Sequence, residues 1–263
     1  MSKIIRRGVL FAGGESSKYG PNFIKGLQLS AITLPNSNLV IPYTGRAAVP
    51  VASGVYSQGI YMFSFFRYGN YPSYCTIIRL NTTGSQIADI LLTNDSTLTA
   101  VSYNGGSIMN FAGSSINVSN AYYYIVHKIT IKDNPSDLAT VADFVSTMNI
   151  VKVCSPTRTN YSEGGRYGFY MNTTVAEENY YCFACFRNIH VEDYTDSSEF
   201  CISQIKNTSV TELTGTTSRA YYKMNYVVGS GSYTLKCIST VGAGAEAATA
   251  DMLPNGLMFF TLS

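Results

Sequence analysis

Charged side chains are scarce in this chain of 263 residues. Asp, Glu, Lys and Arg together make up 13 % of it, about half the share of roughly a quarter that is usual in soluble domains. Eighteen Lys and Arg residues against sixteen Asp and Glu residues leave a net charge of +2. Proteins that follow the phosphates of nucleic acids need many cationic contacts, so this balance argues against nucleic-acid binding.

Long apolar runs are missing as well. No stretch approaches the roughly 18 apolar residues of a membrane-spanning helix, so we expect no membrane insertion. The apolar run Gly8–Ala12 is too short for the core of a signal peptide, which has about 7 to 15 residues. We therefore expect a protein made in a reducing cytoplasm, with mostly buried free thiols. The six cysteines are Cys75, Cys154, Cys182, Cys185, Cys201 and Cys237.

Only two histidines are present, and neither has a setting typical of catalysis. His127 lies in the strand-like run 122–132, where alternation places it on one face with Ile125 and Ile129. We expect packing and one hydrogen bond to satisfy it. His190 precedes Glu192 and Asp193, and we interpret it as part of a polar strand end or loop rather than a metal site.

Other motifs with catalytic or ligand-binding chemistry are also absent. Cys182 and Cys185 form a C-x-x-C in a strand-like setting, where residues three apart face opposite sides and grip no common ion. The carboxylates around Asp193 lack the pattern of a calcium loop, and no phosphate-binding loop occurs. The sequence predicts no catalytic residue, metal site or cofactor. An enzyme that uses a carboxylate pair, Glu177-Glu178 or Glu192-Asp193, is the third-ranked alternative.

What the chain does contain is 21 Tyr, 13 Phe and many Ser, Thr, Asn and Gly residues. The turn dipeptides Asn104-Gly105 and Asn255-Gly256 precede strand-like segments, and short strands separated by turns favour β-sandwich units. Apolar residues at helical spacing predict one helix over 136–148, with Ser136 as its N-cap. The predicted fold is mainly β, with at most one or two short helices.

Three pairs of segments indicate an internal repeat. Tyr61–Arg67 matches Tyr181–Arg187, and Cys75 with Asn81-Thr82 matches Cys201 with Asn207-Thr208. Ala139–Asp143 resembles Ala247–Asp251, each before an apolar strand. Chance similarity in a β-rich sequence is the alternative. We interpret residues 1–37 as an N-terminal anchoring arm, 38–153 as a first β unit and 154–263 as its duplicate.

Two sets of residues are candidates for binding. The basic, strand-like start of the arm is either a solvated segment or a docking element for an acidic neighbour; its candidate assembly residues are Lys3, Ile4, Ile5, Arg6 and Arg7. Tyrosine clusters suit recognition, although Tyr is also an ordinary half-buried sheet residue, and the absence of Trp removes the strongest stacking platform for sugars. The candidate ligand-binding residues are Tyr68, Tyr71, Tyr74, Tyr161, Tyr167 and Tyr170.

The opening segment, Lys3 to Gly14, resembles the short leading strands of tail and fibre proteins of bacteriophages that infect gut bacteria. The resemblance implies a non-enzymatic virion structural protein of the tail, baseplate or fibre type, located in the virion. It would form a homo-oligomer, perhaps a trimer, and dock on other virion proteins by strand addition of its arm. The β units would meet neighbours or a host-surface glycan. A capsid head-fibre or decoration protein and a carbohydrate-binding module are the alternatives.

Overall fold

The structure, a computed structural model, describes residues 18–32, 41–43, 46–50, 56–66, 72–106, 108–116, 123–154, 157–161, 166–173, 180–187, 198–206, 209–215, 222–229, 232–239 and 256–263. Within these residues the fold is mainly β with two short helices, as predicted.

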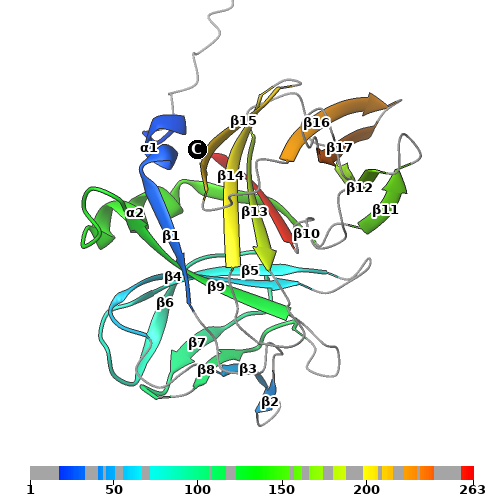
Figure 1. Ribbon diagram of the computed structural model, residues 1–263. Coiled ribbons are helices and arrows are strands. Elements are labelled where there is room, and N and C mark those ends of the chain that lie inside the picture. Colours follow the sequence, from blue (N-terminus) through cyan, green and yellow to red (C-terminus); the bar gives the residue numbers. More distant parts are fainter. Residues whose placement is uncertain are drawn as a thin grey trace, which may run out of the picture.

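The first half of the chain folds into one helix followed by nine strands within the described residues (Figure 1). They are α1 (Pro21–Lys25), β1 (Leu27–Ala31), β2 (Ile41–Tyr43), β3 (Arg46–Pro50), β4 (Gly59–Phe66), β5 (Tyr74–Leu80), β6 (Gln86–Thr93), β7 (Ala100–Tyr103), β8 (Ile108–Ala112) and β9 (Tyr123–Ile131). An antiparallel sheet of order β1-β9-β4-β5-β6 forms inner sheet 1. It continues through β6 into outer sheet 1, of order β7-β8-β3-β2.

The second half has the same succession of elements. They are α2 (Leu138–Ser146), β10 (Met148–Cys154), β11 (Thr157–Tyr161), β12 (Arg166–Thr173), β13 (Tyr180–Arg187), β14 (Ser198–Lys206), β15 (Ser209–Gly215), β16 (Tyr222–Gly229), β17 (Ser232–Ser239) and β18 (Gly256–Leu262). Inner sheet 2 has the order β10-β18-β13-β14-β15, and outer sheet 2 has the order β16-β17-β12-β11. If nine is subtracted from each strand number, the strand orders of inner sheet 2 and outer sheet 2 become those of inner sheet 1 and outer sheet 1.

Local details repeat together with the topology. A β-bulge interrupts the β5–β6 ladder between Ile77 and Ile78, and another interrupts the β14–β15 ladder between Ile202 and Ser203. The amide of Lys132 donates to the Gly26 carbonyl at 2.9 Å, and the amide of Ser263 donates to the Thr147 carbonyl at the same distance. Bulges are specific features of a sheet, so their recurrence at matching places supports a duplicated unit.

The beginning of each repeat follows one numerical rule. Phe23 and Phe144, Leu27 and Met148, and Met62 and Phe183 occupy equivalent positions, and the numbers in each pair differ by 121. Each repeat therefore starts with its helix. We call residues 18–131 repeat 1 and residues 138–262 repeat 2.

These limits differ from the expected unit boundaries. The expected arm, residues 1–37, includes α1 and β1, yet Leu29 of β1 pairs with Ile129 of β9 inside inner sheet 1. The expected boundary at 153/154 falls at the end of β10, which pairs with β18 in inner sheet 2. Both strands were misplaced because an edge strand that joins its sheet through a distant segment carries no local sign of that partner.

The matched segments also need a shift of one residue. Tyr61 and Phe63 of β4 face the core inside repeat 1, whereas Tyr181 and Phe183 of β13 face the other repeat. The position equivalent to Phe183 is Met62. Because side chains alternate along a strand, a slip of one residue exchanges the two faces. The match of Tyr61–Arg67 with Tyr181–Arg187 found the right strands in the wrong register.

Two further expectations change around α2. Residues 139–143 lie in this helix, which together with β10 corresponds to α1 and β1, so the match with 247–251, which lie outside the described residues, does not belong to the repeat. The N-cap is Asp137, whose carboxylate accepts from the Thr140 amide at 3.0 Å. Ser136 instead donates to the Asn134 side chain. Asp at an N-cap is as favourable as Ser, so composition alone could not separate them.

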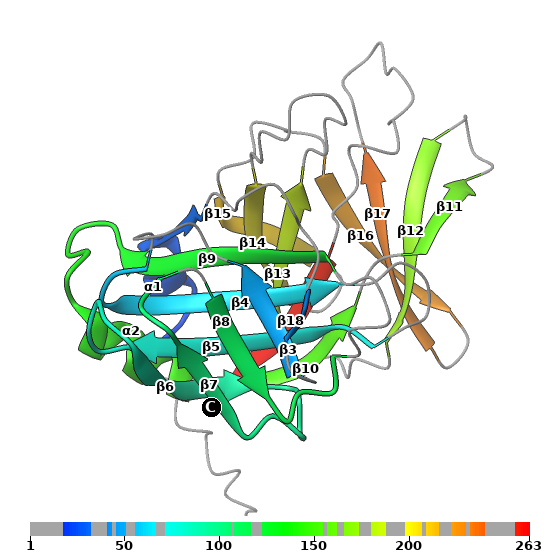
Figure 2. The same cartoon turned by 90° about the horizontal axis from the view of Figure 1, so that it is seen from below.

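Two apolar cores hold the described parts together. One lies between inner sheet 1 and outer sheet 1, where aromatic rings of β4 meet Tyr103 and Phe111. The other lies between the two inner sheets, whose strands cross at a steep angle (Figures 1 and 2). Inner sheet 1 is therefore covered on both faces and joins the two repeats into one body.

Candidate functional site

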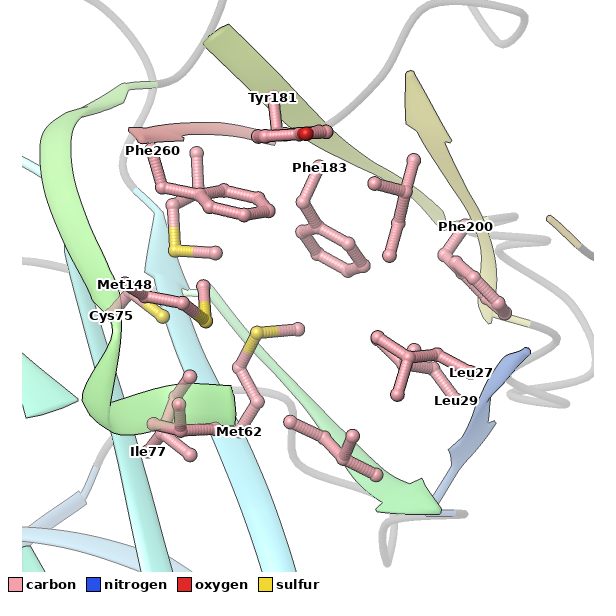
Figure 3. Packing of buried hydrophobic residues seen from close by; sticks show 14 of the residues in the cluster. Leu27, Leu29, Met62, Cys75, Ile77, Met148, Tyr181, Phe183, Phe200 and Phe260 are labelled. Atoms are coloured by element: carbon pink, nitrogen blue, oxygen red, sulfur yellow. The ribbon is translucent and has the colours of Figure 1, made fainter. Parts of the chain in front are cut away.

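The core between the inner sheets is made of matching positions from the two repeats. Leu27 and Met148, Met62 and Phe183, Ile77 and Ile202, and Ile129 and Phe260 all line one small apolar cavity of about 20 Å³. In Figure 3 the side chains of Leu27, Met62 and Ile77 lie on one side, opposite Phe183 and Phe260. A cavity this small and this apolar stays dry. It is a packing gap between two similar surfaces rather than a ligand pocket.

Several contacts between the repeats are reciprocal. α1 packs on β15 of repeat 2, and α2 packs on β6 of repeat 1; β1 lies against β14 while β10 lies against β5. Phe23 and Phe144, the equivalent residues of the two helices, contact each other with ring centroids 5.0 Å apart. This exchange is what a symmetric dimer shows at an isologous interface. The chain is therefore built as a dimer of repeats related by an approximate twofold axis.

His127 of β9 interrupts this apolar interface. Its side chain is 0 % exposed and contacts Phe183 and Phe200 of repeat 2, with ring centroids 5.5 and 6.0 Å away. The expected face, shared with Ile125 and Ile129, is confirmed. The expected hydrogen bond is absent, because neither Nδ1 nor Nε2 has a partner among the described residues. Burial lowers the pKa of this imidazole from 6.5 to about 4.

The N-terminal segment joins the body at a polar clamp. Lys18 forms an ion pair with Asp143 of α2, and the Tyr19 hydroxyl donates to the same carboxylate at 2.5 Å. The Tyr19 ring is buried against Phe23 and Phe144. A residue of repeat 1 is thereby fixed on the helix of repeat 2.

The pKa values at the clamp reflect these contacts. Hydrogen bonds from Lys18 and then Tyr19 lower the pKa of Asp143, and the bond to Asp143 raises the pKa of Lys18. Partial burial is the main cause of the raised pKa of Tyr19. All three groups keep their usual charge at neutral pH. The exposed ion pair itself contributes little, so most of the stabilisation comes from the Tyr19 ring.

The predicted binding residues have different outcomes. Lys3, Ile4, Ile5, Arg6 and Arg7 lie outside the described residues, as do Tyr68 and Tyr71. Tyr74 is half-buried at the start of β5 and packs against the core of repeat 1. Tyr161 lies on β11, and Tyr167 and Tyr170 lie on β12, paired with Asn160 and Thr157. The backbone thus brings these three together on one hairpin and leaves Tyr74 in the other repeat.

The described cysteines are buried, as expected from the sequence. Cys75, Cys185 and Cys201 are buried free thiols, and Cys182 is also buried. Cys185 faces the inter-repeat core while Cys182 points to the other face of β13, as the strand interpretation predicts. Burial raises the pKa of Cys75 to about 12 and that of Cys201 to about 11, so these thiols are poor nucleophiles.

Two described carboxylates serve the fold. Asp89 accepts from Asn81 and Arg79, which lower its pKa, first through the Asn81 bond. Asp95 is buried and accepts four hydrogen bonds, from Thr97 and from Ser114 and Ser115, tying the β6–β7 loop to the segment after β8. His190, Glu177, Glu178, Glu192 and Asp193 lie outside the described residues.

Comparisons with known proteins add no relative: no family model, no curated protein and no solved structure matches this chain. In the described parts of the chain, neither helix has the length and apolar character needed to cross a membrane. The Tyr19–Asp143 clamp was not predicted from the sequence. The segments Phe23–Leu27 and Phe144–Met148 are equivalent. A comparison of these two segments could have indicated from the sequence that each repeat begins with a helix.

Proposed function

We propose that this protein is a non-enzymatic structural component of a bacteriophage virion, of the tail, baseplate or fibre type, and that it docks by strand addition of its N-terminal segment. The observation that carries the proposal is where that segment falls in the repeat. β9 ends repeat 1 and is followed, after a short linker, by the helix of repeat 2. β9 precedes the helix of repeat 2. The equivalent positions before the helix of repeat 1 have numbers lower by 121, which gives residues 2–10.

The residues at these positions have the character of a final strand. Ile4 and Ile5 align with Ile125 and Val126 of β9, and Arg6 and Arg7 align with His127 and Lys128. Residues 2–10 therefore have a sequence like that of the last strand of a repeat. Inside the described body, the two places for such a strand are filled by β9 and β18. A strand-like segment outside these two places suits pairing with the open sheet of another protein.

The composition agrees with this role. The chain carries few charged residues, and the described ion pairs and thiols stabilise the fold. Edge strands provide main-chain donors and acceptors for a neighbour, and a rigid body of two repeats is a suitable building block for a particle. Sequence and fold do not separate a tail component from a capsid head-fibre or decoration protein, which immunogold labelling of particles distinguishes.

The test is deletion of residues 1–17, a limit that leaves the Lys18–Asp143 and Tyr19–Asp143 contacts intact. The truncated protein is expected to keep the circular dichroism spectrum and melting temperature of the full chain and to be missing from purified particles. A sharper variant is Ile5→Pro, because proline removes a ladder donor from a strand, with Gly14→Pro as the control outside the strand-like run. Normal incorporation of the truncated protein would rule out anchoring by this segment.

A glycan-binding module is the second candidate, and the gathering of Tyr161, Tyr167 and Tyr170 on the β11–β12 hairpin favours it. It predicts that the isolated protein binds host polysaccharide on a glycan array and that Tyr161→Ala with Tyr170→Ala, at two positions on one face of the hairpin, removes the signal. Binding that survives this double change would exclude the hairpin as the site.

A further inference from the structure

No contact in the described structure explains why a histidine occupies the buried position 127. A neutral imidazole carries one N–H donor and one acceptor, and here both nitrogens lack partners in the described structure. A buried polar group without a hydrogen bond costs about 1 to 3 kcal/mol. The site therefore weakens the interface between the repeats even at neutral pH.

The other repeat shows that an apolar residue fits this site. The position equivalent to His127 is Met258 of β18: His127 pairs with Met62 of β4, and Met258 pairs with the equivalent residue, Phe183 of β13. Met258 is buried in the same core. The two repeats thus place a methionine and a histidine at matching points, and only the histidine can gain a charge.

Among the described residues, no group around His127 could balance such a charge. On the same face, β4 presents Met62 and Ser64, and the neighbouring strand β1 presents leucines. The titratable groups in the same core are Tyr19, Cys75 of β5, and Tyr181 and Cys185 of β13, all neutral in acid. Asp143 of α2 lies at the rim, where Lys18 and Tyr19 bind its carboxylate. The cation at the rim of the core, Lys132, binds the Lys25 carbonyl and the Thr214 hydroxyl. The described surroundings therefore contain no carboxylate facing the imidazole.

We propose that His127 makes the association of the two repeats sensitive to acid, so that its protonation loosens the core between the inner sheets. The Phe183 and Phe200 rings could attract a cation, yet such contacts contribute at most about 2 kcal/mol, less than the several kcal/mol needed to bury an unpaired ion. The desolvation cost therefore prevails, and the charged imidazole is stable only where water reaches it. The inference is independent of the proposed virion role.

The sign and the pH window follow from linkage. The folded pKa of about 4 lies below the ordinary value of 6.5, so the open state binds the proton more tightly. Stability is full above pH 6.5, falls as the pH drops towards 4, and then levels off for this group. Each pH unit in this window changes the equilibrium up to tenfold, which gives a weakening of roughly 300-fold in total.

The experiment compares the full-length protein with His127→Met, which copies repeat 2 into repeat 1. Hydrogen exchange is measured at pH 7 and pH 4.5. In the wild type, protection is expected to fall at pH 4.5 on β13 and β14, including Phe183 and Phe200, before it falls on the core of repeat 1 around Phe63. His127→Met is expected to keep this protection, and the reciprocal variant Met258→His is expected to make the loss of protection steeper within the same pH window.

An NMR titration of the wild type keeps the test valid if a variant fails to fold. With two histidines in the chain, the ring signals of His127 can be assigned by comparison with a His190→Gln variant. Protonation coupled to loss of inter-repeat protection supports the proposal. Equal acid sensitivity of wild type and His127→Met, or protonation near pH 6.5 with the interface intact, overturns it.

Discussion

At the scale of single residues, polar groups inside this protein follow two patterns. Asp95 is buried and accepts four hydrogen bonds, whereas His127 is buried and has none in the described structure. The first arrangement ties a loop to its neighbour, and the second weakens an interface. A buried polar group is thus informative only when its partners are counted.

Replacing Asp95 by Asn is expected to lower the free energy of unfolding at pH 7 by about 1 to 3 kcal/mol, because an amide nitrogen cannot accept from the donors on its side. Burial alone would raise the pKa of Asp95, but bonds from Ser114, Thr97 and the Ser115 amide hold it below its ordinary value. The carboxylate therefore stabilises the fold above pH 4, and this contribution is lost in stronger acid.

Urea titrations of Asp95→Asn and wild type at pH 7 and pH 3 measure this difference. The gap between the two proteins should narrow at pH 3, where the wild-type carboxylate gains a proton. Asp137→Asn is the matched control, since Asn caps a helix about as well as Asp. A gap that stays constant with pH would show that the charge of Asp95 is irrelevant.

At the scale of elements, the two helices that contact each other differ in length and in how deeply their phenylalanines are buried. α2 is nine residues long and places Phe144 deep in the inter-repeat core, while α1 has five residues and its Phe23 is only partly buried. Phe144→Ala should therefore cost about 3 to 5 kcal/mol of unfolding free energy, and Phe23→Ala clearly less. Thermal melts of both variants check this order. Equal losses would mean that the two helices contribute alike.

Sequence reasoning identified these elements better than it placed them. The strands around Phe63, Phe183 and His127 were predicted, because aromatic and β-branched runs mark buried strands locally. The register between repeats was off by one, since Tyr and Phe occur on both faces of these strands. The clamp of Tyr19 on Asp143 joins residues 124 positions apart, and neither residue carries a local sign of the other.

At the scale of the whole molecule, the chain behaves in structure as a dimer whose subunits are joined by a linker. The linker residues Asp133 to Ser136 are exposed, and the contacts between the repeats come from sheets and helices rather than from this connection. Inner sheet 1 alone would expose its face with Met62, Ile77 and Ile129 to water. An apolar surface of this kind is stable only when it is covered.

Fragments 1–134 and 135–263, expressed together, are therefore expected to purify as a one-to-one complex with the spectrum of the intact protein. Fragment 1–134 expressed alone should dimerise or aggregate through its uncovered face. Size-exclusion chromatography with light scattering distinguishes these outcomes. Two soluble monomers that do not associate would contradict the dimer-like construction of the chain.

The approximate twofold relation affects how a neighbouring molecule can be oriented on this protein. A body that looks nearly the same after half a turn gives a neighbour two almost equal ways to approach it. The helices break this tie, because α1 of repeat 1 has five residues and α2 of repeat 2 has nine. This inequality of the two helices gives polarity to a body that is otherwise nearly symmetric.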